Sequence, residues 1–549
     1  MMVNNVKECA VSAVSLDYDV IIVGAGVSGL AALHNIRRFA PHLRATVLEK
    51  GSGVGGTWLW NTYPGAACDV PSHWYSFSFA AKTDWSRRFS AQEEIRAYLN
   101  QVAAVEGINF FQFNTKVDGA TWDDVGAFWS VGLGGKQAVL RSRYLIAGPG
   151  ALSTTATPIF PGATSFGGKS FHSGAWDHSV AIVGQRVGII GTGCSAAQIV
   201  PAIAPTVKKL IVFQRTASWV SPRGDEEYSK SALLAFAYIP LLALFYRYYL
   251  AFMHDIRYFA FIRPYSKRLL AYAVKISQSH LSRGLRKVES DADRARLLDA
   301  LTPRYALGCK RVITSDDFLP SFSRKNVLLE TATIARITPT GIVVRDAASG
   351  RETVHALDVI VYATGFDVVA SVDSLGVIGR GGHSMKSNFE QNGGPEAYLG
   401  LAVPRFPNLF MMMGPNTGLG HSSMISMIEA QSVYAAKCIA RAEKMGWAAV
   451  EVRDSSSDIY NKEIQLQLRK NVWGSCVSWY SEWLRALQVA VLFSHFPFAS
   501  LTSPPPQTDL QGAKNVVLWP FTVCYYHWVL SRIDWRAWSL RPADAMTAT

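Results

Sequence analysis

The sequence lacks paired cysteines. It holds seven cysteines in 549 residues, an odd number, and none belongs to a Cys-x-x-Cys pair. This absence argues against a zinc site, a dithiol redox centre and a disulfide scaffold, and no bound metal is expected. It favours a reducing, intracellular compartment, most simply the cytoplasm. The N-terminal stretch 1–16 also lacks the long apolar core of a secretory signal.

Long uninterrupted hydrophobic segments are also absent. The most apolar stretch, 231–246, is shorter than the roughly 20 residues that a membrane-spanning helix needs. Pro240 interrupts it. A buried helix is the favoured interpretation, and peripheral contact with a membrane surface is the alternative.

Acidic residues are outnumbered by basic ones. The chain has 54 Lys and Arg residues against 41 Asp and Glu, a formal net charge of +13. A basic balance suits the phosphates of dinucleotides, an anionic membrane surface or nucleic acid. The basic residues are dispersed and no nucleic-acid-binding motif is present, so nucleic acid is not an expected partner.

A dinucleotide-binding unit lies at the start of the chain. Residues 18–23 (YDVIIV) are short, apolar and β-branched, which predicts a buried parallel strand. A helical pattern follows over 30–38, and a second strand over 45–48 ends at Glu49, where a carboxylate accepts ribose hydroxyls. Gly24 makes the tight turn, Gly26 lets the backbone approach a pyrophosphate, and Gly29 lets helix and strand pack closely. This order predicts a nucleotide with free ribose hydroxyls.

The same unit recurs from residue 186. Residues 186–190 and 209–213 predict strands, and the second strand ends in Gln214 and Arg215 with no acid. Arg215 cannot accept a ribose hydroxyl, but it pairs well with a 2′-phosphate, so this site is expected to take NADP. Ala196 replaces the third glycine, which the pattern permits. The expected contacts are Gly191, Thr192, Gly193, Cys194, Ser195, Ala196, Ala197, Gln198, Arg215 and Thr216.

Two dinucleotide units in one chain predict an α/β fold with two Rossmann-like domains and electron transfer from NADPH to FAD. Strands at 143–147 and 356–362 each run into glycines and are expected to mark crossings between the domains. The FAD-binding domain is expected to comprise 1–150 and 355–549. The NADP-binding domain is expected at 151–354, with a mainly helical insertion at about 223–300.

A dense motif stands just before the second glycine loop. Residues 166–177 (FGGKSFHSGAWD) resemble the FxGxxxHxxxW fingerprint of the Baeyer–Villiger monooxygenases. Flavin monooxygenases that oxygenate nitrogen have Tyr at the position of Trp176. The resemblance implies that this segment couples the domains, and that His172 organises it without being the catalytic base. The matched positions are Phe166, Gly168, His172 and Trp176, followed by Asp177.

Two further blocks resemble the same family. Residues 55–79 are similar to the segment that wraps the flavin ring, and residues 308–311 are similar to the catalytic Lys-Arg pair. The resemblance implies that Arg311 is the essential arginine, that Asp69 positions it, and that Lys310 helps hold the 2′-phosphate. The sequence departs from the family at Ala67, where relatives often have an Arg that contacts the nicotinamide side. The implied flavin contacts are Thr57, Trp58, Leu59, Trp60, Asp69 and Tyr75.

The resemblance implies an NADPH-consuming, FAD-dependent monooxygenase that inserts one atom of dioxygen beside a ketone carbonyl, giving an ester or lactone. Residues 71–73 and 84–87 are closest to the branch acting on aryl and bulky ketones. With the apolar helices after Arg223, they favour a bulky hydrophobic ketone of secondary metabolism, such as a polyketide, terpenoid or steroid. Two alternatives stay open: a flavin monooxygenase oxidising nitrogen or sulfur, and a catalytically silent nucleotide-binding protein or defective gene product.

The chain departs most from the family near its C-terminus. In relatives, a motif like Ser478-Trp479-Tyr480 is followed closely by blocks that here stand at 512–515 and 518–520. The intervening insert, about 482–511, combines an apolar run with three consecutive prolines from Pro504. A membrane-touching loop near the substrate entrance and a retained intron are both open explanations.

Overall fold

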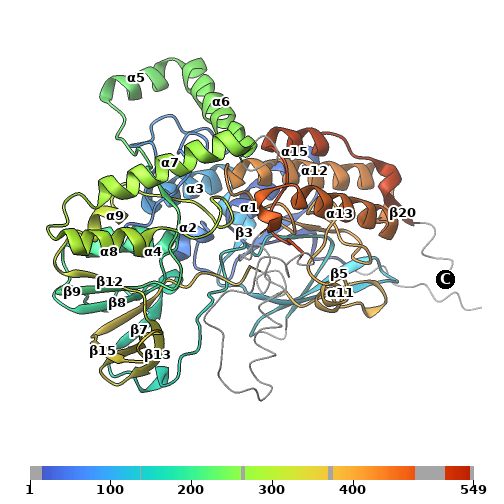
Figure 1. Ribbon diagram of the computed structural model, residues 1–549. Coiled ribbons are helices and arrows are strands. Elements are labelled where there is room, and N and C mark those ends of the chain that lie inside the picture. The colour runs from blue at the N-terminus through green and yellow to red at the C-terminus, as the bar shows by residue number, and fades with distance from the viewer. Residues whose placement is uncertain (1–14, 136–137, 261–265, 369–374, 476–513, 544–549) are drawn as a thin grey trace, which may run out of the picture.

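A computed structural model describes residues 15–135, 138–260, 266–368, 375–475 and 514–543. The insert predicted at 482–511 lies outside these residues. Two sheets covered by helices make up the body of the molecule (Figure 1). The predicted α/β fold with two Rossmann-like units is confirmed.

The first sheet has eight strands in the order β17-β4-β5-β6-β1-β2-β3, with β18 beside β6. Alternate side chains of β1 face opposite layers, as the pleat of a strand requires. Val20 and Ile22 pack with helices α1 and α12, whereas Ile21 and Val23 pack with the layer built from β4 and β5. Full burial of each such side chain stabilises the fold by roughly 1.5–3 kcal/mol. The strands are β1 (Tyr18–Val23), β2 (Ala45–Leu48), β3 (Phe111–Gln112), β4 (Val117–Asp123), β5 (Phe128–Leu133), β6 (Val139–Ala147), β17 (Val377–Ile378) and β18 (Leu409–Met411).

Helices from both ends of the sequence cover this first sheet. Figure 1 shows the blue N-terminal helices and the red C-terminal helices in one body. A short antiparallel pair, β19 with β20, joins the C-terminal segment to it. The elements are α1 (Val27–Phe39), α2 (Thr57–Trp60), α3 (Gln92–Glu106), α11 (Met385–Gln391), α12 (Met424–Met445), α13 (Asp454–Arg469), α15 (Val523–Leu530), β19 (Trp447–Val452) and β20 (Trp538–Pro542).

The second sheet has five parallel strands in the order β12-β9-β8-β16-β7. A three-stranded sheet, β13-β14-β15, and a two-stranded one, β10-β11, accompany it. The elements are β7 (Lys169–His172), β8 (Arg186–Ile190), α4 (Cys194–Ile203), β9 (Lys209–Phe213), β10 (Val220–Ser221), β11 (Ile313–Thr314), α9 (Phe318–Ser321), β12 (Val327–Glu330), β13 (Thr333–Thr338), β14 (Gly341–Arg345), β15 (Glu352–Ala356) and β16 (Val359–Tyr362).

The strand predicted over 356–362 is in fact the end of β15 and the whole of β16. Asp358 separates them, and its carboxylate accepts bonds from the backbone N–H and the Nε of Arg186, at 2.8 and 3.0 Å. β16 then pairs with β8 and β7 in the second sheet. The expected domain boundary at residue 355 therefore lies too early, because the second unit continues to at least Tyr362.

The predicted helical insertion contains α5 (Lys230–Tyr238), α6 (Pro240–Arg257), α7 (Ser266–Gly284) and α8 (Asp291–Leu301). Helices α5 and α6 project from the top of the molecule in Figure 1. The expectation of a buried helix over 231–246 is wrong, because Leu241 is 67% and Phe245 75% exposed. Pro240 is the first residue of α6, where its missing N–H costs nothing. Within the described residues no single helix is long and apolar enough to cross a membrane.

Candidate active site

The first glycine loop is shaped for close contact with a nucleotide. Gly24 has φ +94°, and a Cβ on Gly29 would lie 1.9 Å from the carbonyl oxygen of Gly24. The buried Glu49 carboxylate accepts bonds from the N–H groups of Ala25 and Gly51, both at 2.7 Å. A carboxylate has about four acceptor positions, so two remain for ribose hydroxyls. This cradle fits the adenosine half of FAD.

The second glycine loop leaves space where the phosphates of NADP are expected to bind. A Cβ added to Gly193 would meet no heavy atom within 4 Å, and no described side chain caps the N-terminus of α4 at this residue. Arg215 and Thr216 are exposed just after β9. Gln214 turns inward and donates to the carbonyl of Ala300 at 2.7 Å. The backbone N–H groups at the start of α4 and the exposed guanidinium of Arg215 can bind phosphate groups, and no acid follows β9. These features fit NADP.

Arg311 and Asp69 form an ion pair between segments far apart in the sequence. The Nε and Nη2 of Arg311 donate to Oδ2 of Asp69 at 3.0 and 2.6 Å, and Nη1 donates to the carbonyl of Leu419 at 3.4 Å. Burial would raise the pKa of Asp69, but the charge and hydrogen bonds of Arg311 outweigh it and hold that pKa below its usual value. The side chains of Arg311 and Asp69 are 30% and 26% exposed, so the pair is ionised and accessible.

The predicted flavin-wrapping segment is held by its own aromatic contacts. Trp58 Nε1 donates to the hydroxyl of Tyr75 at 3.1 Å, and the two rings meet edge to face. Gln92 Nε2 donates to the carbonyl of Trp58. Burial raises the pKa of Tyr75 well above its ordinary value, so its hydroxyl stays protonated. Trp60 is exposed, with Lys50 Nζ 5.6 Å from its ring centre.

Gly26 and Gln198 make contacts that the sequence did not indicate. A Cβ on Gly26 would lie 3.3 Å from Cα of Gly56, so the two glycines let the first loop touch the flavin-wrapping segment. Gln198, expected among the NADP contacts, accepts from the hydroxyl of Tyr63 at 2.9 Å and donates to the carbonyl of Ala67 at 2.9 Å. Its side chain therefore binds α4 to the segment beside Asp69.

The fingerprint segment forms the edge strand β7 of the second sheet and the loop that follows it. Strand β7 pairs with β16, and His172 Nδ1 accepts from the N–H of Gly174 at 3.0 Å. The His172 ring stands edge-on to Phe366, and Trp176 stands edge-on to Phe171. Burial lowers the pKa of His172, which keeps the ring neutral. A neutral histidine in this loop agrees with the organising role implied for it.

Lys310 and Cys309 lie directly before Arg311. Lys310 Nζ is 5.0 Å from the ring centre of Tyr305, and its joint action with Arg215 on a 2′-phosphate stays a prediction. Cys309 is disulfide-bonded. Four other cysteines within the described residues are free: Cys68, Cys194, Cys438 and Cys524.

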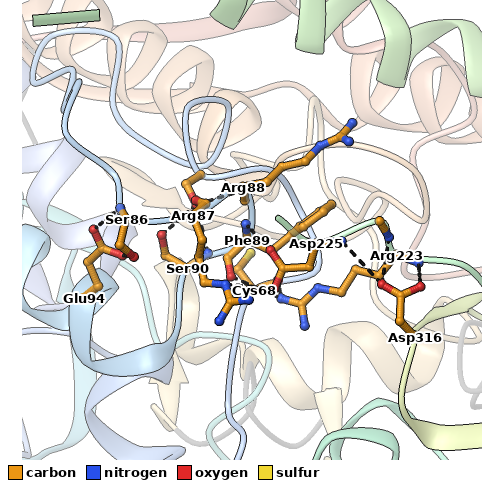
Figure 2. Close-up of polar contacts among 12 residues, drawn as sticks. Cys68, Ser86, Arg87, Arg88, Phe89, Ser90, Glu94, Arg223, Asp225 and Asp316 are labelled. Atoms are coloured by element: carbon orange, nitrogen blue, oxygen red, sulfur yellow. Dashed lines mark hydrogen bonds and ion pairs between the residues drawn. The ribbon is translucent and has the colours of Figure 1, made fainter. Parts of the chain in front are cut away.

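A clamp between residues 86–90 and 223–228 joins the two units, and sequence analysis missed it (Figure 2). Arg87 Nε forms an ion pair with Asp225 at 3.0 Å, and the N–H of Phe89 donates to the same carboxylate at 3.2 Å. Arg223 Nη2 donates to the carbonyl of Cys68 at 2.7 Å, and the Arg223 charge also lowers the pKa of Asp69. Phe89 and Asp225 are 136 residues apart, and no local pattern connects such positions.

Comparison with known proteins places this geometry in a family. Residues 17–246 match the family model described as flavin-binding monooxygenase-like. A Baeyer–Villiger monooxygenase of Streptomyces coelicolor is 34% identical over 96% of this chain and 93% of its own length. The chain belongs to the Baeyer–Villiger monooxygenases.

Solved structures agree with this membership. A steroid monooxygenase bound to NADP is 27% identical, with a TM-score of 0.77 over 96% of this chain and 99% of the other. An enzyme named OTEMO, in complex with FAD and NADP, shares the fold, with 24% identity and a TM-score of 0.79 over 96% of this chain and 100% of the other. The predicted family, enzyme class and cofactor pair of this Baeyer–Villiger monooxygenase are therefore confirmed, whereas the roles of its individual site residues stay predictions.

Proposed function

We propose that this Baeyer–Villiger monooxygenase acts on a bulky hydrophobic ketone and that the Arg311–Asp69 pair is its reacting centre. The observation that carries the proposal is the double hydrogen bond of Arg311 to Asp69, with a further bond to Leu419. These contacts hold one cation where the flavin-wrapping segment, the loop before β11 and the loop before α12 meet.

The chemistry divides between cofactors and chain. FAD and NADPH supply reduction and the activation of dioxygen when they are bound. Arg311 stabilises negative charge at the reacting centre, because its guanidinium stays charged and does not donate a proton at neutral pH. Asp69 fixes the orientation of the guanidinium, so little reorganisation is needed during the reaction. Arg215 and Thr216 select the 2′-phosphate of NADPH.

The segment around Asp69 supports a bulky hydrophobic ketone, such as a polyketide, terpenoid or steroid. Residues 71–73 and 84–87 resemble the branch of the family that acts on aryl and bulky ketones. One protein of similar fold is named as a steroid monooxygenase bound to NADP. The intracellular location expected from the cysteines also stays a proposal.

A substrate panel tests this proposal. The purified, flavin-loaded protein is given small cyclic ketones, aryl ketones, steroid ketones and a thioether, and NADPH oxidation is followed with product mass. We expect the highest kcat/KM with the bulky ketones and products heavier than substrate by one oxygen atom. A preference for small cyclic ketones would overturn the proposed substrate class. Sulfoxide formation without ester from any ketone would overturn the assigned reaction as well.

A further inference from the structure

Helix α6 exposes many of its apolar residues. Its exposed positions recur with helical spacing, so they form one continuous side of the helix rather than scattered contacts. Phe245 is 75% exposed and Phe252 63%. We define the apolar face as Leu241, Leu244, Phe245, Tyr248, Tyr249 and Phe252, all exposed.

The inward side of α6 combines buried apolar side chains, such as Leu250, with polar groups that are firmly hydrogen-bonded. Arg247 donates to the carbonyl of His73 and to Oγ of Ser76, at 2.7 and 2.9 Å. The carboxylate of Asp255 accepts from the N–H groups of Val523 and Cys524, both at 3.2 Å. A soluble helix places its apolar side inward, whereas α6 also carries a continuous apolar side on the outside. These buried hydrogen bonds fix the rotation of the helix about its axis, so the apolar face stays exposed.

His254 and Tyr258 extend the same inward side. His254 Nδ1 and the carbonyl of His421 lie 3.0 Å apart, and the hydroxyl of Tyr258 donates to the carbonyl of Pro520. His421 belongs to the loop whose Leu419 carbonyl accepts from Arg311. The exposed helix therefore also supports the loop that contacts the reacting centre.

The charged residues from α5 to α7 are almost all basic. Residues 230–284 contain eight Lys and Arg residues and a single acid, Asp255, and of these Arg247 and Asp255 are buried in the contacts above. Lys230 at the start of α5, and Lys267 and Arg268 at the start of α7, are exposed next to the apolar helices. Apolar side chains flanked by cations are complementary to a surface with an apolar interior and anionic head groups.

No single helix in the described part of the chain is long and apolar enough to span a membrane. Helix α5 and the helical stretch that follows it reach the length and apolarity of a membrane span only when they are taken together, and the bend between them is 107°. The buried, bonded side of α6 also ties it to the protein body. Helices of this kind lie in the plane of the membrane interface.

We propose that α5, α6 and the start of α7 dock this protein onto the surface of an anionic lipid bilayer. The apolar face enters the boundary between head groups and acyl chains, and Lys230, Lys267 and Arg268 contact the anionic head groups. The bilayer then lies against the helix whose inner side contacts the flavin-wrapping segment. This docking is independent of which ketone the enzyme oxidises.

Vesicle flotation of the full, flavin-loaded chain tests the proposal. One set of vesicles contains phosphatidylcholine alone, and the other contains phosphatidylcholine with phosphatidylserine. We expect the protein to float with the anionic vesicles and less with the neutral ones. The triple variant Phe245→Glu, Tyr249→Glu, Phe252→Glu should lower the partition coefficient at least about 100-fold, because three apolar side chains no longer enter the bilayer. Lys267→Gln with Arg268→Gln should lower it about five-fold per charge on anionic vesicles only.

A matched control separates docking from general surface change. The triple variant Val105→Glu, Ile159→Glu, Val183→Glu changes equally exposed apolar residues elsewhere and should float like the unaltered protein. Flavin content and thermal midpoint show whether each variant is folded. Absence of flotation by the unaltered protein, or unchanged flotation of the folded α6 variant, would overturn the proposal. So would light scattering that shows a vesicle-free dimer which the α6 variant loses, because the face would then be a subunit interface.

Discussion

Arg311 is held by bonds to two partners that come from other parts of the chain. Its two donors to Asp69 fix the plane of the guanidinium, and the Leu419 carbonyl receives a third. An ammonium group could supply the charge but not this planar set of donors. The residue therefore acts through both its charge and its fixed direction.

Substitution of Arg311 should separate chemistry from cofactor binding. Arg311→Ala should lower the rate of ester formation at least about 100-fold, as expected when a preorganised charge at the reacting centre is lost. Arg311→Lys should recover only part of this rate. Bound flavin, measured by absorbance, should remain, because Glu49 and the first glycine loop lie elsewhere.

Arg304→Ala is the matched control. Arg304 lies in the same connection after α8, but its ion pair with Asp299 is on the surface. This variant should keep the full rate of ester formation. Normal ester yield from Arg311→Ala would show that the role belongs to another residue.

At the scale of single elements, α6 and the loop before α12 meet through two buried histidines. Burial lowers the pKa of His254 to about 4 and that of His421 to about 3, against an ordinary value of 6.5. The unfolded chain therefore binds more protons than the folded chain below pH 6.5, so the free energy of unfolding falls as the pH drops from there towards 4. Lowering the pH from about 7 to about 5.5 should reduce the free energy of unfolding by about 1 kcal/mol per histidine.

Urea unfolding followed by tryptophan fluorescence at the two pH values checks this expectation. His254→Gln should lose part of the pH dependence, since one buried titrating group is gone. His42→Gln, at an exposed position, should keep all of it. Equal pH dependence in His254→Gln and the unaltered chain would contradict the assignment.

Elements with a strong local signal could be predicted from the sequence, and those fixed by distant contacts could not. The strands at 18–23, 45–48, 186–190 and 209–213 were predicted with their observed bounds, because buried parallel strands are short, continuous apolar runs. The split at Asp358 depends on Arg186, which is 172 residues away. Helix α6 was expected to be buried because apolar residues usually are, but it exposes Leu241, Phe245 and Phe252.

The site shows the same division. The family resemblance implied that Asp69 positions Arg311, and the structure brings the two residues together across 242 positions of sequence. The clamp of Arg87 with Asp225 and the bridge made by Gln198 could not be predicted, because no motif in the sequence around these residues indicates a distant partner. Such contacts become visible only when the two units are assembled.

At the scale of the whole molecule, several contacts that join the two nucleotide-binding units lie beside the proposed reacting centre. Gln198 connects α4 to the stretch 63–67, Arg223 reaches the carbonyl of Cys68, and Arg311 pairs with Asp69. These three contacts fall on one short stretch, 63–69. Electron transfer from one bound nucleotide to the other requires such a fixed relation, which the contacts on this stretch provide.

The central claim is that this chain places one atom of dioxygen beside a ketone carbonyl and needs Arg311 to do so. The most direct measurement gives the flavin-loaded protein NADPH, a bulky ketone and isotopically labelled dioxygen, and records the product mass. The account predicts an ester or lactone with one labelled oxygen atom from the unaltered protein, and at least about 100-fold slower formation of it by Arg311→Ala with its flavin still bound. NADPH consumption without any labelled ester, or an equal yield of labelled ester from Arg311→Ala, would contradict it.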